Sequence, residues 1–221
     1  MRDRLTVVLP LADVGAEMRN ICKENIYRKI NHFFILRGLL DEIFHKFASM
    51  KRIVVITGGA RSGKSSYAEK LALSIAPNPV YMATARIWDE DFRERVRRHQ
   101  ERRGDEWTNI EEDKWLSRHD VSGRTVLVDC LTLWSTNFFF DLNSDVDAAL
   151  EEIRHEFDKF TSQDATFIFV TNEIGMGGTS GNELQRKFTD LLGFVNQYAA
   201  EQADEVVLMV SGIPVKVKSD K

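Results

Sequence analysis

The feature that most constrains the fold is the run GGARSGKS at residues 58–65, which directly follows the apolar run RIVVIT. Gly-x4-Gly-Lys-Ser is the pattern of a phosphate-binding loop (P-loop). Its context agrees, because a continuous β-branched run typical of a buried parallel strand precedes it and a helical pattern follows it. The glycines let backbone N–H groups approach phosphate oxygens, and the next helix presents its positive end to them. The motif therefore predicts an α/β fold that holds a nucleotide where its first core strand ends.

The residue types in this loop predict individual roles. Lys64 is expected to reach the β- and γ-phosphates, and the Ser65 hydroxyl is expected to ligate Mg²⁺. A second metal ligand is expected at the end of a neighbouring strand, where the run VLVDC supplies Asp129. The alternatives are a chance glycine-rich turn and an aspartate that caps a helix or turn. The predicted nucleotide-binding residues of the loop are Gly58, Gly59, Ala60, Arg61, Ser62, Gly63, Lys64 and Ser65.

Strand-like and helix-like segments alternate from residue 51 onward. The expected strands are residues 52–57, 79–84, 125–130, 165–171, 205–210 and 215–218; the expected helices are 65–76, 89–103, 113–119, 144–160 and 182–203. This alternation predicts an α/β fold of the P-loop NTPase (RecA-like) kind, a mainly parallel sheet with helices on both faces. Glu173 follows an expected strand at the same edge, where a catalytic base, a group beside the metal and a plain loop residue are all open readings.

Composition limits the possible functions. The net charge of -4 argues against a nucleic-acid-binding surface, which needs an excess of basic side chains. Two cysteines suggest neither a disulfide framework nor a zinc site, and Cys130 in its apolar run is expected to be a buried thiol. No apolar run reaches the roughly 18 residues of a membrane span, and the start lacks a signal-peptide pattern. We therefore expect a cytoplasmic protein.

The first fifty residues do not share the alternation, so we divide the chain into an N-terminal extension, 1–50, and a P-loop domain, 51–221. One hypothesis is that translation starts at Met50, directly before the first core strand. The alternative is a genuine extra helix within 25–47 that packs on the core or on a partner.

The run RVRRHQERR at residues 95–103 places five arginines around His99. On a helix His99 borders the apolar side formed by Phe92 and Val96. Nearby guanidinium groups should lower the imidazole pKa, and neutral imidazole is a nucleophile. The arginines would also neutralise charge on a phosphate under attack. The alternatives are a solvated basic face, a packing histidine and a nucleic-acid patch, the last disfavoured by the acidic balance.

An ordered set of motifs resembles one family closely, from about residue 52 to residue 218. Its parts are TGGARSGKS, YMATA, the His99 helix, Trp107-x3-Glu111, VLVDCLTLWSTN, VTNEIGMG, the NELQRKFTDLLGFVNQ helix and the ending VVLMVSGIPVKVK. Together they resemble the bifunctional adenosylcobinamide kinase / adenosylcobinamide-phosphate guanylyltransferase family of cobalamin biosynthesis.

The resemblance implies two reactions: phosphorylation of adenosylcobinamide by ATP or GTP, and transfer of GMP from GTP through a GMP-histidine to give adenosylcobinamide-GDP. It places the guanylylated histidine on His99. It implies Mg²⁺ as cofactor, adenosylcobinamide and its phosphate as partners, and a homo-oligomer, in particular a trimer. Beyond the P-loop, it implies GTP contacts at Thr84, Ala85, Arg86, Gln100, Glu101, Arg102, Arg103, Glu111 and Asp129.

Three rival functions stay open at this point. The first two are a guanylyltransferase without kinase activity and a P-loop small-molecule kinase without a GMP adduct. The third is a nucleotide-gated interaction module, which would bind GTP or ATP and transfer nothing.

Overall fold

The computed structural model describes residues 51–86 and 104–219, all within one compact unit that spans residues 48–221. The expected helix over 89–103, with His99, and the N-terminal extension lie outside the described residues. Within the described ranges, no helix has the length and the apolar character that crossing a membrane requires.

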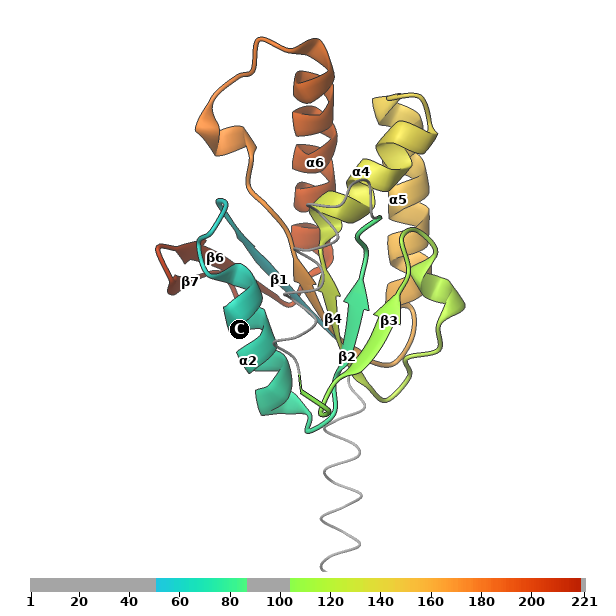
Figure 1. Cartoon of the computed structure of the whole chain (residues 1–221), viewed down its shortest axis with the longest axis vertical. Helices are drawn as coiled ribbons and strands as arrows, with labels where there is room; N and C mark the ends of the chain where they lie inside the picture. Colours follow the sequence, from blue (N-terminus) through green and yellow to red (C-terminus); the bar gives the residue numbers. More distant parts are fainter. Residues whose placement is uncertain (1–50, 87–103, 220–221) are drawn as a thin grey trace, which may run out of the picture. The chain divides into compact units, whose positions relative to one another are not determined.

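A seven-stranded sheet forms the centre of the unit, in the order β3-β2-β4-β5-β1-β6-β7 (Figure 1). Every neighbouring pair is parallel except β6 and β7, which are antiparallel. The prediction of a mainly parallel α/β sheet is therefore confirmed. The strands are β1 (Arg52–Gly58), β2 (Val80–Ala83), β3 (Thr108–Glu111), β4 (Thr125–Asp129), β5 (Thr166–Val170), β6 (Glu205–Val210) and β7 (Ile213–Lys218).

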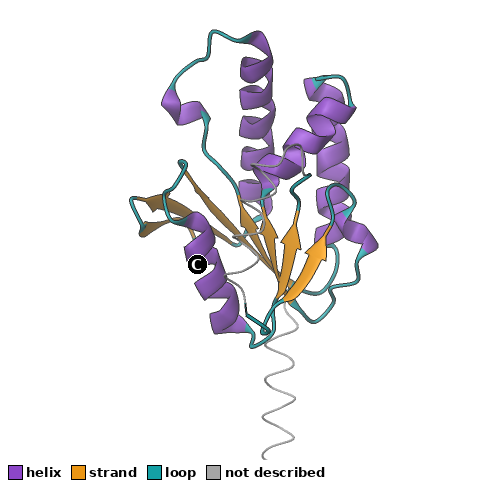
Figure 2. Ribbon diagram, in the orientation of Figure 1, coloured by secondary structure: helices purple, strands orange, loops and turns teal. Residues whose placement is uncertain are grey.

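Helices cover both faces of the sheet, as predicted (Figure 2). One face carries α2 (Lys64–Ile75), and the other carries α4 (Leu131–Asp141), α5 (Val146–Thr161) and α6 (Glu183–Gln202). Two short 3-10 turns, η1 (Leu116–Arg118) and η2 (Gly175–Gly177), lie in the loops.

The helix starts follow local capping chemistry. Asp145 caps α5, because its carboxylate accepts a hydrogen bond from the N–H of Ala148 at 3.0 Å. Asn182 caps α6 in the same way, through the N–H of Gln185 at 3.1 Å. Ser144 and Asp145 stand side by side before the helical pattern and are both residue types that cap helices, and the structure selects the aspartate.

Three predicted features differ in the structure. The helix expected over 113–119 is only the 3-10 turn η1. The helix α4 was not expected, because apolar and aromatic residues occur nearly all around it and no helical period stands out. The strand β3 was also missed, since this short edge strand is mostly exposed and carries little apolar alternation.

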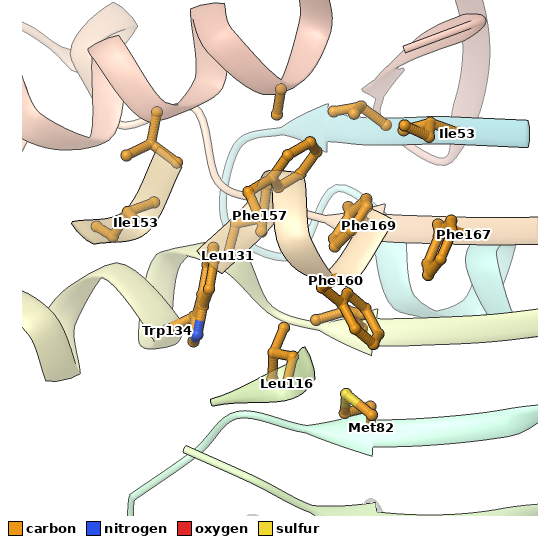
Figure 3. Close-up of a cluster of buried hydrophobic side chains, with 14 of the residues drawn as sticks. Ile53, Met82, Leu116, Leu131, Trp134, Ile153, Phe157, Phe160, Phe167 and Phe169 are labelled. Carbon is orange, nitrogen blue, oxygen red and sulfur yellow. The ribbon is translucent and has the colours of Figure 1, made fainter. Parts of the chain in front are cut away.

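The sheet side chains alternate between two apolar clusters, and this alternation sets where polar groups emerge. Ile53 and Val55 face α4, α5 and α6 in the larger cluster, among the aromatic rings of Phe157, Phe167 and Phe169 (Figure 3). The smaller cluster faces α2 and includes Val54, Ile56, Tyr81 and Leu127. Residues at the strand ends that continue the second set therefore open onto the P-loop and α2.

Candidate nucleotide-binding site

The P-loop leaves β1 at Gly58 and enters α2 at Lys64 through backbone conformations that require glycine. Gly58 has a φ of 146°, and a Cβ there would lie 2.6 Å from the carbonyl oxygen of Met209. Gly63 caps α2 in the left-handed region with a φ of 96°. Only glycine meets both demands without strain, so these two residues fix the shape of the loop.

Lys64 closes the loop on itself. Its Nζ donates hydrogen bonds to the carbonyl oxygens of Gly58 at 2.9 Å and of Gly59 at 2.6 Å, and the residue is only 7% exposed. Burial lowers the pKa of this ammonium group, although the nearby side chains of Cys130 and Asp129 act in the opposite direction. A buried cation with only carbonyl partners gains from an anionic partner, and a phosphate is the anion that this loop fits.

A cavity of about 570 Å³ opens beside the loop. Its walls bring the P-loop together with the ends of β4 and β5, which the sequence had placed at the same edge. The lining residues are Ala60, Arg61, Ser62, Gly63, Lys64, Ser65, Ser66, Asp129, Cys130, Val170 and Asn172. The structure thus gathers six of the predicted loop residues, 60–65, and Asp129 around one space.

Asp129 ends β4 on the face that carries α2. Its Oδ2 accepts a hydrogen bond from the hydroxyl of Tyr81 at 2.8 Å, which fixes the carboxylate. It does not cap α4, whose N-cap is Cys130 and which has no side-chain cap bond. The predicted alternative of a helix cap is therefore wrong.

The donor set of the cavity fits Mg²⁺ bound together with a nucleotide. Mg²⁺ takes oxygen ligands and is held in such sites by one or two protein groups plus phosphates and water. The Ser65 hydroxyl and the Asp129 carboxylate are ligands of this kind, and both line the cavity. Across residues 51–86 and 104–219, no cluster of three acidic, histidine or cysteine side chains could hold a metal without the nucleotide.

The turn after β2 forms a second group of predicted residues, and its polar atoms are already engaged. Thr84 is fully buried; its hydroxyl donates to the carbonyl of Cys130 and accepts from the N–H of Cys130, both at 2.8 Å. From α4, the Nδ2 of Asn137 donates to the carbonyls of Thr84 at 2.9 Å and Asp113 at 2.8 Å. The turn is therefore held in shape by Asn137 of α4 and by Cys130, the N-cap of the same helix.

Arg86, at the end of this turn, lies between two carboxylates. Its Nε donates to Asp113 at 2.7 Å, and its terminal nitrogens form a bidentate pair with Asp141 at 2.8 and 3.1 Å. These contacts raise the pKa of Arg86 and, with help from Lys114, lower the pKa of Asp141 to about 2. Arg86, Thr84 and the predicted Glu111 do not line the P-loop cavity.

Glu173 has a structural role in the described loop. Its N–H donates to the carbonyl of Gly58 at 3.0 Å, and its Oε1 accepts from the N–H of Gly175 at 3.2 Å. It does not line the cavity, so the geometry favours the loop reading over the catalytic one.

Cys130 is buried as predicted, and burial raises its pKa to about 12.

Sequence reasoning missed four residues that build this edge: Tyr81, Thr132, Asn137 and Asn172. Asn172 carries the same signal as Asp129, a polar residue after a buried strand, so it could have been found. Thr132 and Asn137 could not, because their roles depend on α4. The predicted residues His99, Gln100, Glu101, Arg102 and Arg103 lie outside the described residues.

Comparison with known proteins adds a family to this geometry. A family model described as cobinamide kinase / cobinamide phosphate guanyltransferase matches residues 54–217. The bifunctional adenosylcobalamin biosynthesis protein CobU of Salmonella typhimurium is 38% identical over 181 residues, which are 75% of this chain and 99% of the relative. CobU of Escherichia coli is 37% identical over 183 residues, with the same two shares. CobP of Pseudomonas aeruginosa is 36% identical over 171 residues, 75% of this chain and 97% of that protein.

Among solved structures, the flagellar accessory protein FlaH of Methanocaldococcus jannaschii aligns with a TM-score of 0.40 and 12% identity. The alignment covers 78% of this chain and 80% of FlaH. A likeness at this level carries no information about the site.

Proposed function

Because the chain belongs to the cobinamide kinase / cobinamide phosphate guanyltransferase family, we propose that its P-loop cavity and His99 divide two successive transfer reactions between them. The chain is a bifunctional enzyme of adenosylcobalamin biosynthesis. It phosphorylates adenosylcobinamide with ATP or GTP and then transfers GMP from GTP to the product, which gives adenosylcobinamide-GDP.

The observation that carries the kinase half is the cavity between the P-loop and Asp129. The N–H groups of the loop and the Lys64 ammonium hold the β- and γ-phosphates, and a phosphate oxygen replaces the carbonyl of Gly59 as a partner of Nζ. The acceptor hydroxyl oxygen attacks the γ-phosphorus, the bond to the β–γ bridging oxygen breaks, and the nucleoside diphosphate leaves. The hydroxyl proton passes to solvent.

Ser65 and Asp129 are the residues that would hold Mg²⁺ in this cavity. When bound, the ion supplies neutralisation of the charge on the phosphate oxygens. The hydroxyl of Tyr81 donates a hydrogen bond to Oδ2 of Asp129 and so fixes the plane of the carboxylate. The other oxygen, Oδ1, is left to bind the ion. This arrangement supports the metal role of Asp129 over a purely structural one.

The guanylyl half needs a nucleophile for the α-phosphate, and we propose that His99 is this nucleophile. A neutral imidazole nitrogen attacks the α-phosphorus of GTP, the α–β P–O bond breaks, and pyrophosphate leaves. A phosphate oxygen of the phosphorylated cobinamide then attacks the same phosphorus. The P–N bond breaks and His99 is regenerated.

We also propose that GTP is held by Gln100, Glu101, Arg102, Arg103, Glu111 and the turn Thr84–Ala85–Arg86. One described feature supports this grouping. Glu111 ends β3 and the turn follows β2, and these two strands are neighbours in the sheet, with Glu111 in register with Ala83.

Labelling with GTP that carries ³²P at the α-phosphate tests the histidine. We expect the wild type to retain label after denaturation, to lose it in acid and to keep it in alkali, as a phosphoramidate does. His99→Ala should take no label, whereas the matched control His155→Ala should label normally. Absence of label in the wild type, with GTP binding confirmed, would remove His99 as the nucleophile and leave a P-loop kinase.

The oligomeric state is part of the same proposal. We expect a homo-oligomer, and the family resemblance implies a trimer. Light scattering on the purified protein should give three times the chain mass of 25.4 kDa. A mass equal to one chain would contradict it.

A further inference from the structure

Asn172 occupies a position that the topology of the sheet singles out. β5 lies between β4, which ends at Asp129, and β1, which leads into the P-loop. In register, Val170 pairs with Asp129 on one side and with Ile56 on the other. Asn172 follows two residues later, so it falls on the same face as Val170, the face of α2. It therefore lies between the predicted metal carboxylate and the P-loop, and it lines the cavity.

The fold holds Asn172 from two helices. From α4, the Thr132 hydroxyl oxygen accepts hydrogen bonds from the Asn172 N–H at 2.9 Å and from its Nδ2 at 3.1 Å. From α6, the Nδ2 of Asn196 donates to the carbonyl of Asn172 at 3.0 Å. Asn196 is itself fixed, because its Oδ1 accepts from the hydroxyl of Thr171 at 2.7 Å. Both the backbone and the side-chain amide of Asn172 are thus positioned before any ligand arrives.

The side-chain amide oxygen of Asn172 remains for a ligand. One of the two Nδ2–H groups donates to Thr132, whereas Oδ1 has no hydrogen-bond partner among residues 51–86 and 104–219. This oxygen is a neutral acceptor in a half-buried place. The Lys64 ammonium, the Ser65 hydroxyl and the loop N–H groups of the same cavity can all donate to phosphate oxygens.

A neutral acceptor has little to offer a phosphate, whose oxygens are acceptors too. Of the two groups that react in the kinase step, the hydroxyl of the acceptor substrate is the one that carries a proton to donate. We propose that Oδ1 of Asn172 accepts the hydrogen bond of this attacking hydroxyl and directs its oxygen lone pair at the γ-phosphorus. The inference rests on the proposed kinase function and deepens it by naming the residue that recognises the alcohol substrate.

In this step Asn172 orients the hydroxyl and does not remove its proton. A carboxamide oxygen is too weakly basic to keep the proton, so the proton passes to solvent as the new O–P bond forms and the β–γ bridge bond breaks. Orientation of this kind is sensitive to distance, and a displacement of about 1 Å can cost roughly 100-fold in rate.

The test measures both reactions of one preparation. Asn172→Ala should lower kcat for cobinamide phosphorylation by about 100-fold with an unchanged KM for the nucleotide. Labelling by α-³²P GTP uses no hydroxyl nucleophile, so its rate should stay at the wild-type level. This second readout also shows that the variant is folded. Asn109→Ala, on the exposed part of β3, is the matched control and should leave both rates unchanged.

Thr132 provides a second variant pair. Thr132→Val removes the hydroxyl that holds the Asn172 amide and should lower the kinase rate to a smaller extent, while Thr132→Ser keeps the hydroxyl and should restore it. An unchanged kinase rate in Asn172→Ala would overturn the proposal. So would equal loss of both reactions with a raised Mg²⁺ requirement, because this pattern marks a residue of the metal site. A wild type that phosphorylates no cobinamide would instead refute the proposed function itself.

Discussion

Two segments at the same edge of the sheet were expected to contact nucleotide, and the structure builds them in different ways. The P-loop, 58–65, is shaped by its own glycines and by Lys64, and it faces an open cavity. The turn Thr84–Ala85–Arg86 is shaped by distant partners, since Cys130, Asn137 and two carboxylates engage its polar atoms. A local motif therefore predicts the first segment, whereas tertiary contacts determine the second.

We expect the largest loss of kinase activity from a substitution in the P-loop. Lys64→Ala removes the buried cation of the cavity and should lower the phosphorylation rate by about 100- to 1000-fold, the usual cost of losing one fixed charge-stabilising donor. A kinase assay with cobinamide measures it, and Lys70→Ala on the exposed side of α2 is the control. Phosphorylation near the wild-type rate in Lys64→Ala would contradict a role of the P-loop cavity in binding the transferred phosphate.

The turn should respond most strongly to a change in α4. Asn137→Ala leaves the buried carbonyl of Thr84 and the partly buried carbonyl of Asp113 without this donor, so we expect the free energy of unfolding to fall by about 1–3 kcal/mol. Urea denaturation measures the loss, with Asn109→Ala as the control. If stability did not change, α4 would not be what holds the turn.

Thr84→Val tests whether the Thr84 hydroxyl serves the fold or the nucleotide. Valine keeps the shape and removes both hydrogen bonds to Cys130, so unfolding free energy should fall by about 1 kcal/mol while the KM for GTP changes little. Thr84→Ser retains the hydroxyl and should stay close to the wild type. A large rise in KM at unchanged stability would show that the hydroxyl contacts GTP directly.

The smallest effect concerns the carboxylates around Arg86. The pKa of Asp141 is lowered to about 2, whereas the ordinary pKa of an aspartate is about 4. The ion pair therefore stabilises the folded state fully at pH values above about 4, and this contribution is lost as the pH falls from about 4 to 2. Asp141→Asn should lower stability at neutral pH by less than about 1 kcal/mol, because the pair is exposed. Acid unfolding followed by circular dichroism should show a flatter pH dependence between pH 4 and 2 in this variant. If the variant and the wild type showed the same pH profile, the ion pair would not contribute to the stability of the fold.

The sequence predicted what depends on neighbouring residues. The P-loop and the buried strands follow from local patterns, the cap of α5 follows to within one residue, and Asp129 follows from its place after a strand. Arg86 was assigned to GTP by resemblance, but its ion pairs with Asp113 and Asp141 join residues far apart in the chain. Such pairs leave no local signal.

The helix α4 explains why the rest of the site could not be predicted. Its buried residues include Trp134, Phe138 and Phe139, which hide any helical period. Once the helix is placed, the spacing of Thr132 and Asn137 becomes meaningful, because one holds Asn172 and the other holds the turn. Thr132 and Asn137 thus hold residues that are distant in the sequence and come near α4 only in the folded chain.

We propose that the P-loop cavity performs phosphoryl transfer independently of His99, the proposed carrier of GMP. The most direct measurement follows phosphate from γ-³²P ATP into cobinamide with wild-type protein and with His99→Ala. We predict equal rates of cobinamide phosphorylation, with GMP transfer from GTP abolished in the variant. A parallel loss of phosphorylation in His99→Ala would contradict the division of the two reactions.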